Sequence, residues 1–86
     1  MAFKDIRPSA PVHLLLAPKR HVASILTLVP EDRGLVADLI FAAKDIAASQ
    51  RLLGYRLGFN VGRLGGQMVD HVHLHLLGGW QEQEKG

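Results

Sequence analysis

Four short stretches rich in apolar residues predict β-strands, and in the last two the apolar residues alternate with polar or histidine residues. Side chains on a strand point alternately to its two faces, so this alternation places the apolar residues on one buried face. Pro8 and Pro11 separate the first two stretches, because proline removes a backbone donor and favours an extended connection. The predicted strands cover residues 3–6, 12–17, 55–61 and 71–77.

An apolar stripe at helical spacing predicts one main helix between the second and third strands. Pro30 suits a first helical position, and Glu31 and Asp32 in the first turn interact favourably with the helix dipole. Gly54 is expected to end the helix in a left-handed conformation. The stripe consists of Leu35, Val36, Leu39, Ile40, Ala43, Ile46, Ala47 and Leu53.

The predicted order of elements is strand, strand, helix, strand, strand, with a flexible loop over residues 62–66. This order is typical of an α+β fold in which an antiparallel sheet packs against one main helix. At 86 residues, of which 48% are apolar, the chain can form one small core but not two. We therefore expect one domain over residues 1–80 and a hydrophilic tail over residues 81–86.

Charge and composition exclude several classes of protein. The ten basic and eight acidic residues give a net charge of +2, and the basic residues are scattered, so nothing favours binding of a nucleic acid. No apolar run is long enough for a membrane span or laid out as a secretory signal. Without cysteine the chain has no disulfide and no thiolate metal site. A cytoplasmic protein that binds a small anion remains compatible with this composition.

Three histidines at alternate positions, His71, His73 and His75, are the most informative feature of the chain. On a strand they would form a row spaced about 6.6 Å apart on one face. A row of three imidazoles, each titrating near neutral pH, is costly to bury and hard to explain as packing, so it predicts a ligand site. A single histidine between apolar residues is more often structural, and His13 is interpreted in that way.

Two chemistries could use this histidine row. Three imidazoles could bind zinc as a catalytic three-ligand set. However, Asp70 is the only nearby acid, and the preceding Gly65-Gly66-Gln67 segment offers backbone donors that suit an anion better than a cation. Attack at phosphorus needs a neutral imidazole, charge stabilisation around the oxygens and a proton for the leaving group. The segment 65–75 could meet all three needs, so phosphate chemistry is favoured.

The segment His71-Val72-His73-Leu74-His75-Leu76-Leu77 resembles the histidine triad (HIT) motif, His-φ-His-φ-His-φ-φ, where φ is apolar. Gly65-Gly66-Gln67 precedes it at the spacing found in that family. The segments 3–13 and 18–21 are also similar to the family, so the resemblance covers residues 3–80. It is closest to the nucleotide-binding branch, whose members bind purine nucleoside monophosphates and hydrolyse nucleoside phosphoramidates.

The resemblance implies a role for each histidine of the cluster. His73 would be the nucleophile that takes up the nucleotidyl group through phosphorus. His71 would orient His73, partly through its backbone carbonyl, and His75 would contact the phosphate or the leaving group. His21 would complete the imidazole cluster from the other side. The displacement requires no metal and no cofactor, because imidazoles and backbone amides supply the positive field.

The same resemblance implies a nucleotide site. Asp5 would bind the ribose hydroxyls, and Ile6 would line the base. The phosphate would be cradled by Asn60 and by the amides of Gly66, Gln67 and Met68. Met68 stands where relatives often carry a polar residue such as serine, so this side chain would not donate a hydrogen bond to phosphate.

The partner is therefore expected to be a purine nucleoside monophosphate or phosphoramidate. A homodimer is also expected, because the helix stripe and residues 55–61 exceed what so short a chain can cover. Compared with the family, the chain is expected to lack N-terminal elements. Its fold is therefore expected to be an N-terminally truncated form. Two alternatives remain open: a non-catalytic nucleotide-binding or interaction module, and a three-histidine metal hydrolase.

Overall fold

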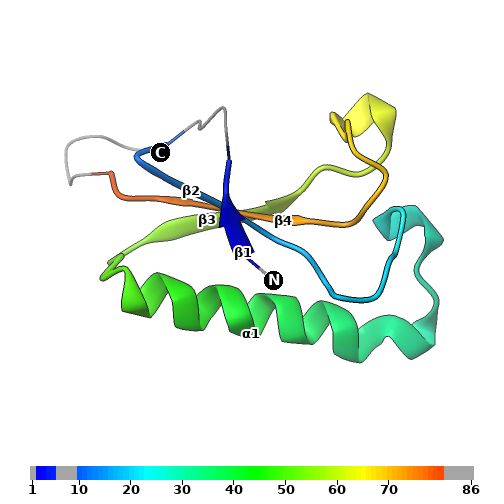
Figure 1. Ribbon diagram of the computed structural model, residues 1–86, viewed down its shortest axis with the longest axis horizontal. Coiled ribbons are helices and arrows are strands. Elements are labelled where there is room, and N and C mark those ends of the chain that lie inside the picture. Colours follow the sequence, from blue (N-terminus) through cyan, green and yellow to red (C-terminus); the bar gives the residue numbers. More distant parts are fainter. Residues whose placement is uncertain (1, 6–9, 81–86) are drawn as a thin grey trace.

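The computed structural model describes residues 2–5 and 10–80, which form an antiparallel four-stranded sheet with one long helix along one face (Figure 1). The strand order is β1-β2-β4-β3, and every neighbouring pair is antiparallel. The predicted α+β fold and order of elements are confirmed. The elements are β1 (Ala2–Lys4), β2 (Val12–Leu16), α1 (Arg33–Ser49), β3 (Tyr55–Phe59) and β4 (Leu74–Gly78).

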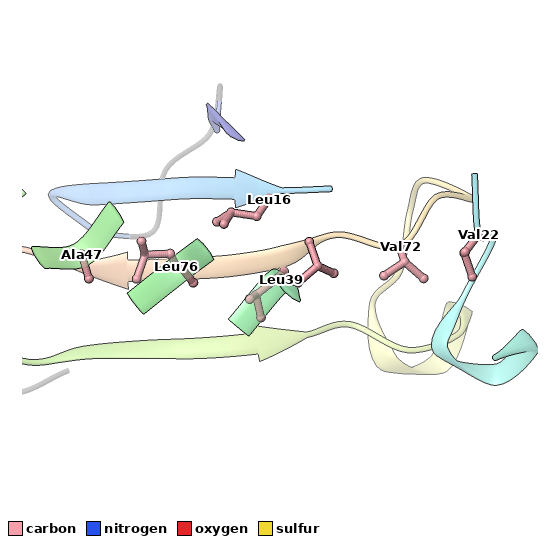
Figure 2. Close-up of a cluster of buried hydrophobic side chains, with 8 residues drawn as sticks. Leu16, Val22, Leu39, Ala47, Val72 and Leu76 are labelled. Atoms are coloured by element: carbon pink, nitrogen blue, oxygen red, sulfur yellow. The ribbon is translucent and has the colours of Figure 1, made fainter. Parts of the chain in front are cut away.

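The hydrophobic core lies between α1 and the sheet. Leu16 pairs with Leu74 across β2 and β4, and both side chains are almost fully buried. Ala43 and Ala47 lie on the covered side of α1, where their small side chains allow the helix to approach the sheet closely. Figure 2 shows several of these core side chains between helix and strands. The buried set comprises Leu16, Val22, Leu39, Ala43, Ala47, Val72, Leu74 and Leu76.

The opposite face of the sheet carries the candidate chemistry. Leu15 pairs with both Phe3 of β1 and His75 of β4, so these three residues share one face. His13 lies two residues before Leu15 on the same strand and points to that face as well. The helix-covered face of the sheet is thus core, while the other face is available for a ligand.

The helix begins and ends at different residues from those predicted. A 3-10 turn, Pro30–Asp32, precedes α1, which then ends at Ser49 rather than near Gly54. Arg51, not Gly54, adopts the left-handed conformation, with φ 58°.

Backbone hydrogen bonds explain this earlier end. The Arg51 N–H donates to the carbonyl of Ala48 and the Leu52 N–H to that of Ala47, the pattern of a Schellman cap. The helix therefore stops before the last apolar residue of the predicted stripe. Leu53 is fully exposed instead of buried.

The last strand also begins later than predicted, at Leu74 instead of His71. Before it, the Val72 N–H donates to the carbonyl of Val22 at 2.6 Å, so this stretch pairs with a loop rather than with a strand. The alternation of burial still holds, since Val72, Leu74 and Leu76 are buried.

The third strand and the loop that follows differ from expectation in smaller ways. β3 ends at Phe59, two residues before the predicted end. The loop expected to be flexible contains a 3-10 turn, Arg63–Gly65.

Some expectations concern residues outside the described part of the chain. Ile6, expected to line a base, and the tail over residues 81–86 lie there. The domain boundary at residue 80 therefore stays a prediction. Within the described residues, no helix is both long and apolar enough to span a membrane.

Candidate active site

The ring of His73 is oriented by a backbone carbonyl. Its Nδ1 lies 2.8 Å from the carbonyl oxygen of His71. Because a carbonyl oxygen only accepts, Nδ1 must carry the proton and donate it. The neutral ring then has its lone pair on Nε2, the nitrogen that can act as a nucleophile.

His71 is held on both sides of its own ring. Its Nε2 lies 3.3 Å from the carbonyl oxygen of Pro18, and its Nδ1 lies 2.9 Å from Nδ1 of His21. The carbonyl requires a proton on Nε2 of His71, so Nδ1 of His71 accepts and His21 donates. His21 is therefore hydrogen-bonded to His71, the residue whose carbonyl accepts from His73.

His75 contacts a histidine that the sequence analysis left out of the site. Nε2 of His13 lies 2.9 Å from Nδ1 of His75, and it lies 3.4 Å from the Asp5 carboxylate. His13 is buried, as expected of a structural histidine, and it also contacts a residue of the candidate site. His13 on β2 and His75 on β4 meet diagonally, because His13 itself pairs with Leu77. The sequence could not reveal this contact without the register of the two strands.

The Asp5 carboxylate decides which way the proton lies between the two rings. A carboxylate only accepts, so Nε2 of His13 carries a proton and donates it to Nδ1 of His75. The neutral His75 ring then carries its own proton on Nε2. This tautomer makes His75 a proton donor at the nitrogen facing away from His13.

Burial lowers the pKa of His75 below its ordinary value of 6.5, and the neighbouring His73 and His13 lower it further. The Asp5 carboxylate acts in the opposite direction but does not outweigh them. His75 is therefore neutral near pH 7. A neutral His75 places no positive charge against the His73 ring, whose centroid lies 5.0 Å from its own.

A cavity of about 470 Å³ brings several of the predicted site residues together on the open face of the sheet. It is large enough for much of a nucleotide. The sequence analysis missed Phe3 and Leu15, which give the cavity an apolar wall. Leu15 stands in the continuous apolar run Leu14-Leu15-Leu16, which does not show which face each side chain occupies. The lining consists of Phe3, Lys4, Asp5, Leu15, Asn60, Gly66, Met68, Val69, His73 and His75.

Three of the predicted residues that the structure describes, His21, His71 and Gln67, do not line this cavity. His71 lines a smaller cavity of about 200 Å³, in which His73 also takes part. The histidine cluster thus has an inner part, His73 and His75, and an outer part, His71 and His21.

Fewer backbone amides are available to a phosphate group than the sequence analysis expects. The N–H of Gly66 donates to the carbonyl of Arg63 at 3.0 Å, and that of Gln67 donates to the carbonyl of Gly62 at 2.9 Å. In the described part of the chain, the N–H of Met68 has no such acceptor. The Met68 amide therefore stays available to an anion, whereas the two amides before it are committed to the turn.

Asn60 and Gly66 lie close together at the edge of the cavity. Gly66 has φ 88°, and a Cβ on it would lie 2.8 Å from Nδ2 of Asn60. Only glycine fits this position, because a side chain would be strained and would displace the Asn60 amide. The carboxamide of Asn60 makes no hydrogen bond to the other described residues and can meet a ligand.

The three strand histidines do not form a shared metal site. His71 is bonded to His21 and Pro18, while His73 is bonded through Nδ1 to the backbone. Among residues 2–5 and 10–80, the group that could hold a metal ion is Asp5, His13 and His75, whose ligand atoms lie within 4.8 Å of one another. These groups also satisfy one another by hydrogen bonding, without an ion.

Comparisons with known proteins agree with this geometry. The model of the HIT domain family matches residues 1–82. An uncharacterized HIT-like protein of Synechococcus elongatus is 46% identical over 80 residues, which are 92% of this chain and 70% of the relative.

Solved structures share the fold. The HIT family hydrolase of Legionella pneumophila superposes with a TM-score of 0.90 at 52% identity, covering 93% of this chain and 73% of that one. The histidine triad nucleotide-binding protein of Candida albicans gives a TM-score of 0.75 at 32% identity, covering 99% of this chain and 70% of that one. The chain belongs to the HIT domain family.

Proposed function

We propose that this protein hydrolyses purine nucleoside phosphoramidates, or related nucleotidyl esters, through a covalent nucleotidyl-His73 intermediate. The observation that carries the proposal is the hydrogen bond from Nδ1 of His73 to the carbonyl of His71, at 2.8 Å. It leaves the lone pair of Nε2 on a ring that lines the cavity. Membership of the HIT family, with a hydrolase among its similar structures, supports hydrolytic chemistry in general.

In the first step, Nε2 of His73 attacks phosphorus and the phosphorus–nitrogen bond to the leaving group breaks. The leaving amine takes a proton from Nε2 of His75, and the electron pair of the broken bond goes to the amine nitrogen. At the same time Nδ1 of His75 takes over the proton of His13, which is replaced from the solvent, so the His75 ring stays neutral. His73 gains a positive charge on bonding to phosphorus. The His71 carbonyl stabilises this charge through the proton on Nδ1.

In the second step, a water molecule replaces the amine. Nε2 of His75, now with a lone pair, accepts a proton from the water as its oxygen attacks phosphorus. The proton on Nδ1 of His75 returns to His13, which releases one proton to the solvent. The bond between phosphorus and His73 breaks, and its electron pair returns to Nε2. The products are a nucleoside monophosphate, the amine and the neutral histidines, so no other reactant is required.

The rest of the cavity suits the remainder of a nucleotide. Asn60 and the Met68 amide offer donors to the phosphate, and the Asp5 carboxylate offers an acceptor to the ribose hydroxyls. Phe3 is half exposed at the same cavity and presents an aromatic face to a base. The nucleotide-binding protein of Candida albicans among the similar structures supports this ligand class.

The test measures turnover and the covalent intermediate together. The protein is mixed with adenosine 5′-phosphoramidate, ammonia release is followed, and quenched samples are examined by intact-mass spectrometry for an added adenylyl group. Turnover with an adenylylated His73 supports the proposal. Binding of AMP without turnover would replace it with a non-catalytic binding module. Turnover that is lost with a chelator and restored by zinc would replace it with a metal hydrolase.

We also propose that the protein forms a homodimer. β3 is an edge strand, with Tyr55 and Leu57 partly exposed, and α1 exposes Ile40 and Phe41. An uncovered strand edge beside exposed apolar side chains favours pairing with a second copy.

A further inference from the structure

Gln67 is one of two polar side chains that are buried in the described part of the chain; the other is His13. Only 4% of Gln67 is exposed, although it follows two glycines in a loop. Burial of an amide is costly unless each of its polar atoms is hydrogen-bonded. The contacts of Gln67 therefore show what the residue does.

The carboxamide of Gln67 makes three hydrogen bonds. Its Oε1 accepts from the N–H of Gly62 at 3.0 Å, and its Nε2 donates to the carbonyls of Ala23 at 2.6 Å and Val69 at 3.0 Å. A backbone N–H requires the oxygen, and two carbonyls require the nitrogen, so the orientation of the amide is unambiguous. Both N–H donors of the side chain are used inside the protein, and its oxygen accepts one hydrogen bond there.

Each partner of Gln67 lies within two residues of a candidate site residue. Gly62 follows Asn60 by two residues, Val69 follows Met68 directly, and Ala23 follows His21 by two residues. The Val69 carbonyl also accepts the N–H of His71 at 2.9 Å. The Gln67 side chain thus joins the backbone segments that carry the outer histidines to those that carry the phosphate donors.

A second set of contacts, made by exposed side chains, joins residues of the same loop. The Arg63 guanidinium donates to the carbonyl of Gln67 at 2.6 Å and pairs with Asp70 at 2.8 Å. Both charged side chains are more than 60% exposed, so this ion pair contributes little in water. The buried hydrogen bonds of Gln67 are therefore the contacts that set the position of the loop.

We propose that Gln67 is a positioning residue for phosphate: it holds the Met68 amide and Asn60 at a fixed distance from the histidine cluster without touching the ligand. This inference rests on the proposed function, since it assumes that a phosphate group is bound there. It differs from the expected phosphate contact through the Gln67 backbone amide, because that N–H donates to the carbonyl of Gly62 and the side chain has no donor left to offer.

The decisive variant is Gln67→Glu, which keeps nearly the same shape. A glutamate can still accept from the Gly62 N–H, but its carboxylate has no donor and faces the carbonyls of Ala23 and Val69. We expect the affinity for AMP to fall about tenfold to a hundredfold, as for the loss of one or two hydrogen bonds to phosphate. The affinity for adenosine, which has no phosphate, should stay within about threefold of wild type.

Two further variants serve as controls. Gln50→Glu makes the same chemical change at an exposed residue at the end of α1, and it should bind AMP like wild type. Gln67→Met fills the same space without any strong donor or acceptor and should show the same selective loss of AMP affinity. If Gln67→Glu does not fold, the methionine variant decides the question.

Amide NMR spectra separate this inference from the proposed function. If wild type binds no AMP, the proposed function fails, and the spectra of the ligand-free proteins still report on the loop. Positioning predicts shifted amide signals for Met68, His71 and Ala23 in the Gln67 variants and an unchanged signal pattern in β1 and α1. Unchanged signals at these three residues, or equal losses of AMP and adenosine affinity, would overturn the inference.

Discussion

Nε2 of His13 lies 2.9 Å from Nδ1 of His75, so two imidazoles are joined across the central strands β2 and β4. The Asp5 carboxylate lies 3.4 Å from the same Nε2 of His13, and because a carboxylate only accepts, this nitrogen carries the proton that His75 accepts. The consequence is that the ring nitrogen of His75 opposite this contact carries a proton. A residue buried behind the cavity therefore sets the tautomer of a residue that lines it.

His13→Phe is expected to slow turnover while sparing nucleotide binding. The variant keeps a planar ring but removes the N–H that holds Nδ1 of His75 as an acceptor, so His75 can take the wrong tautomer. We expect kcat for adenosine phosphoramidate to fall about tenfold to a hundredfold, within the range that acid–base catalysis contributes. The Kd for AMP, measured by calorimetry, should change less than about threefold. An unchanged kcat would show that His75 needs no such partner.

The stability of the protein is expected to fall as the pH drops below about 6.5. The pKa of His75 is lowered in the folded protein, by burial first and then by His73 and His13. The unfolded chain then binds a proton more readily than the native protein, so acidification favours unfolding. The loss of stability begins near pH 6.5, the ordinary pKa of histidine, and is complete below the lowered pKa of His75 in the folded protein.

Urea denaturation at pH 7.5 and 5.5 measures this effect. The free energy of unfolding should decrease between the two values in wild type, and it should decrease less in His75→Gln, which has no titrating group at this position. An equal decrease in the free energy of unfolding in the two proteins would assign the pH dependence to other groups.

Two leucine substitutions test the packing of the core. Leu76 is fully buried between the sheet and α1, and Leu76→Ala should lower the free energy of unfolding by about 2–5 kcal/mol. Leu53→Ala removes the same atoms from a fully exposed side chain and should change stability by less than about 0.5 kcal/mol. Chemical denaturation measures both values. A large loss in Leu53→Ala would mean that this residue is covered in solution.

The contrast between these leucines also shows how far the sequence predicts the fold. Periodicity identified the strands, their order and the helix, because burial of one face dictates the spacing of apolar residues. It placed Leu53 on the buried stripe, because spacing does not reveal that a Schellman cap at Arg51 ends the helix earlier. Such a cap on a residue other than glycine leaves little local signal.

For the candidate site, the sequence indicated the histidine cluster but not the contacts between distant segments. The spacing of the histidines identified the cluster, and the alternation that buries Val72, Leu74 and Leu76 survives even though β4 begins after His73. The role of His13 depended on the register of β2 and β4. The hydrogen bonds of Gln67 depended on a loop approaching Ala23, 44 residues away. Contacts between distant segments of this kind are not encoded in local patterns.

The proposed homodimer predicts a concentration-dependent mass. Light scattering at tens of micromolar should give twice the mass of the chain. Phe41→Glu should shift the mass toward the monomer, because Phe41 is 64% exposed on α1 and a charge would be desolvated in an interface. Leu64→Glu places the same charge at a fully exposed leucine in the loop after β3 and should leave the dimer intact. A monomeric wild type that unfolds cooperatively would disprove the interface.

His73→Ala is expected to separate binding from chemistry. Removal of the imidazole eliminates the nitrogen that attacks phosphorus, so kcat for adenosine phosphoramidate should fall by at least about a thousandfold. Asn60, His75 and the Met68 amide still surround the phosphate, so AMP should bind with a Kd within about tenfold of wild type. Stopped-time assays measure kcat, and calorimetry measures the Kd for AMP.

Two outcomes distinguish the covalent route from its alternatives. If the alanine variant keeps most of the wild-type rate, His73 is not the nucleophile and water attacks phosphorus directly. If wild type turns over but no adenylyl group appears on His73, even when the reaction is quenched within one turnover, the same conclusion follows. An adduct at His73 that forms and decays at the rate of turnover requires the covalent route, because an intermediate on the pathway must be made and consumed at least as fast as the product appears.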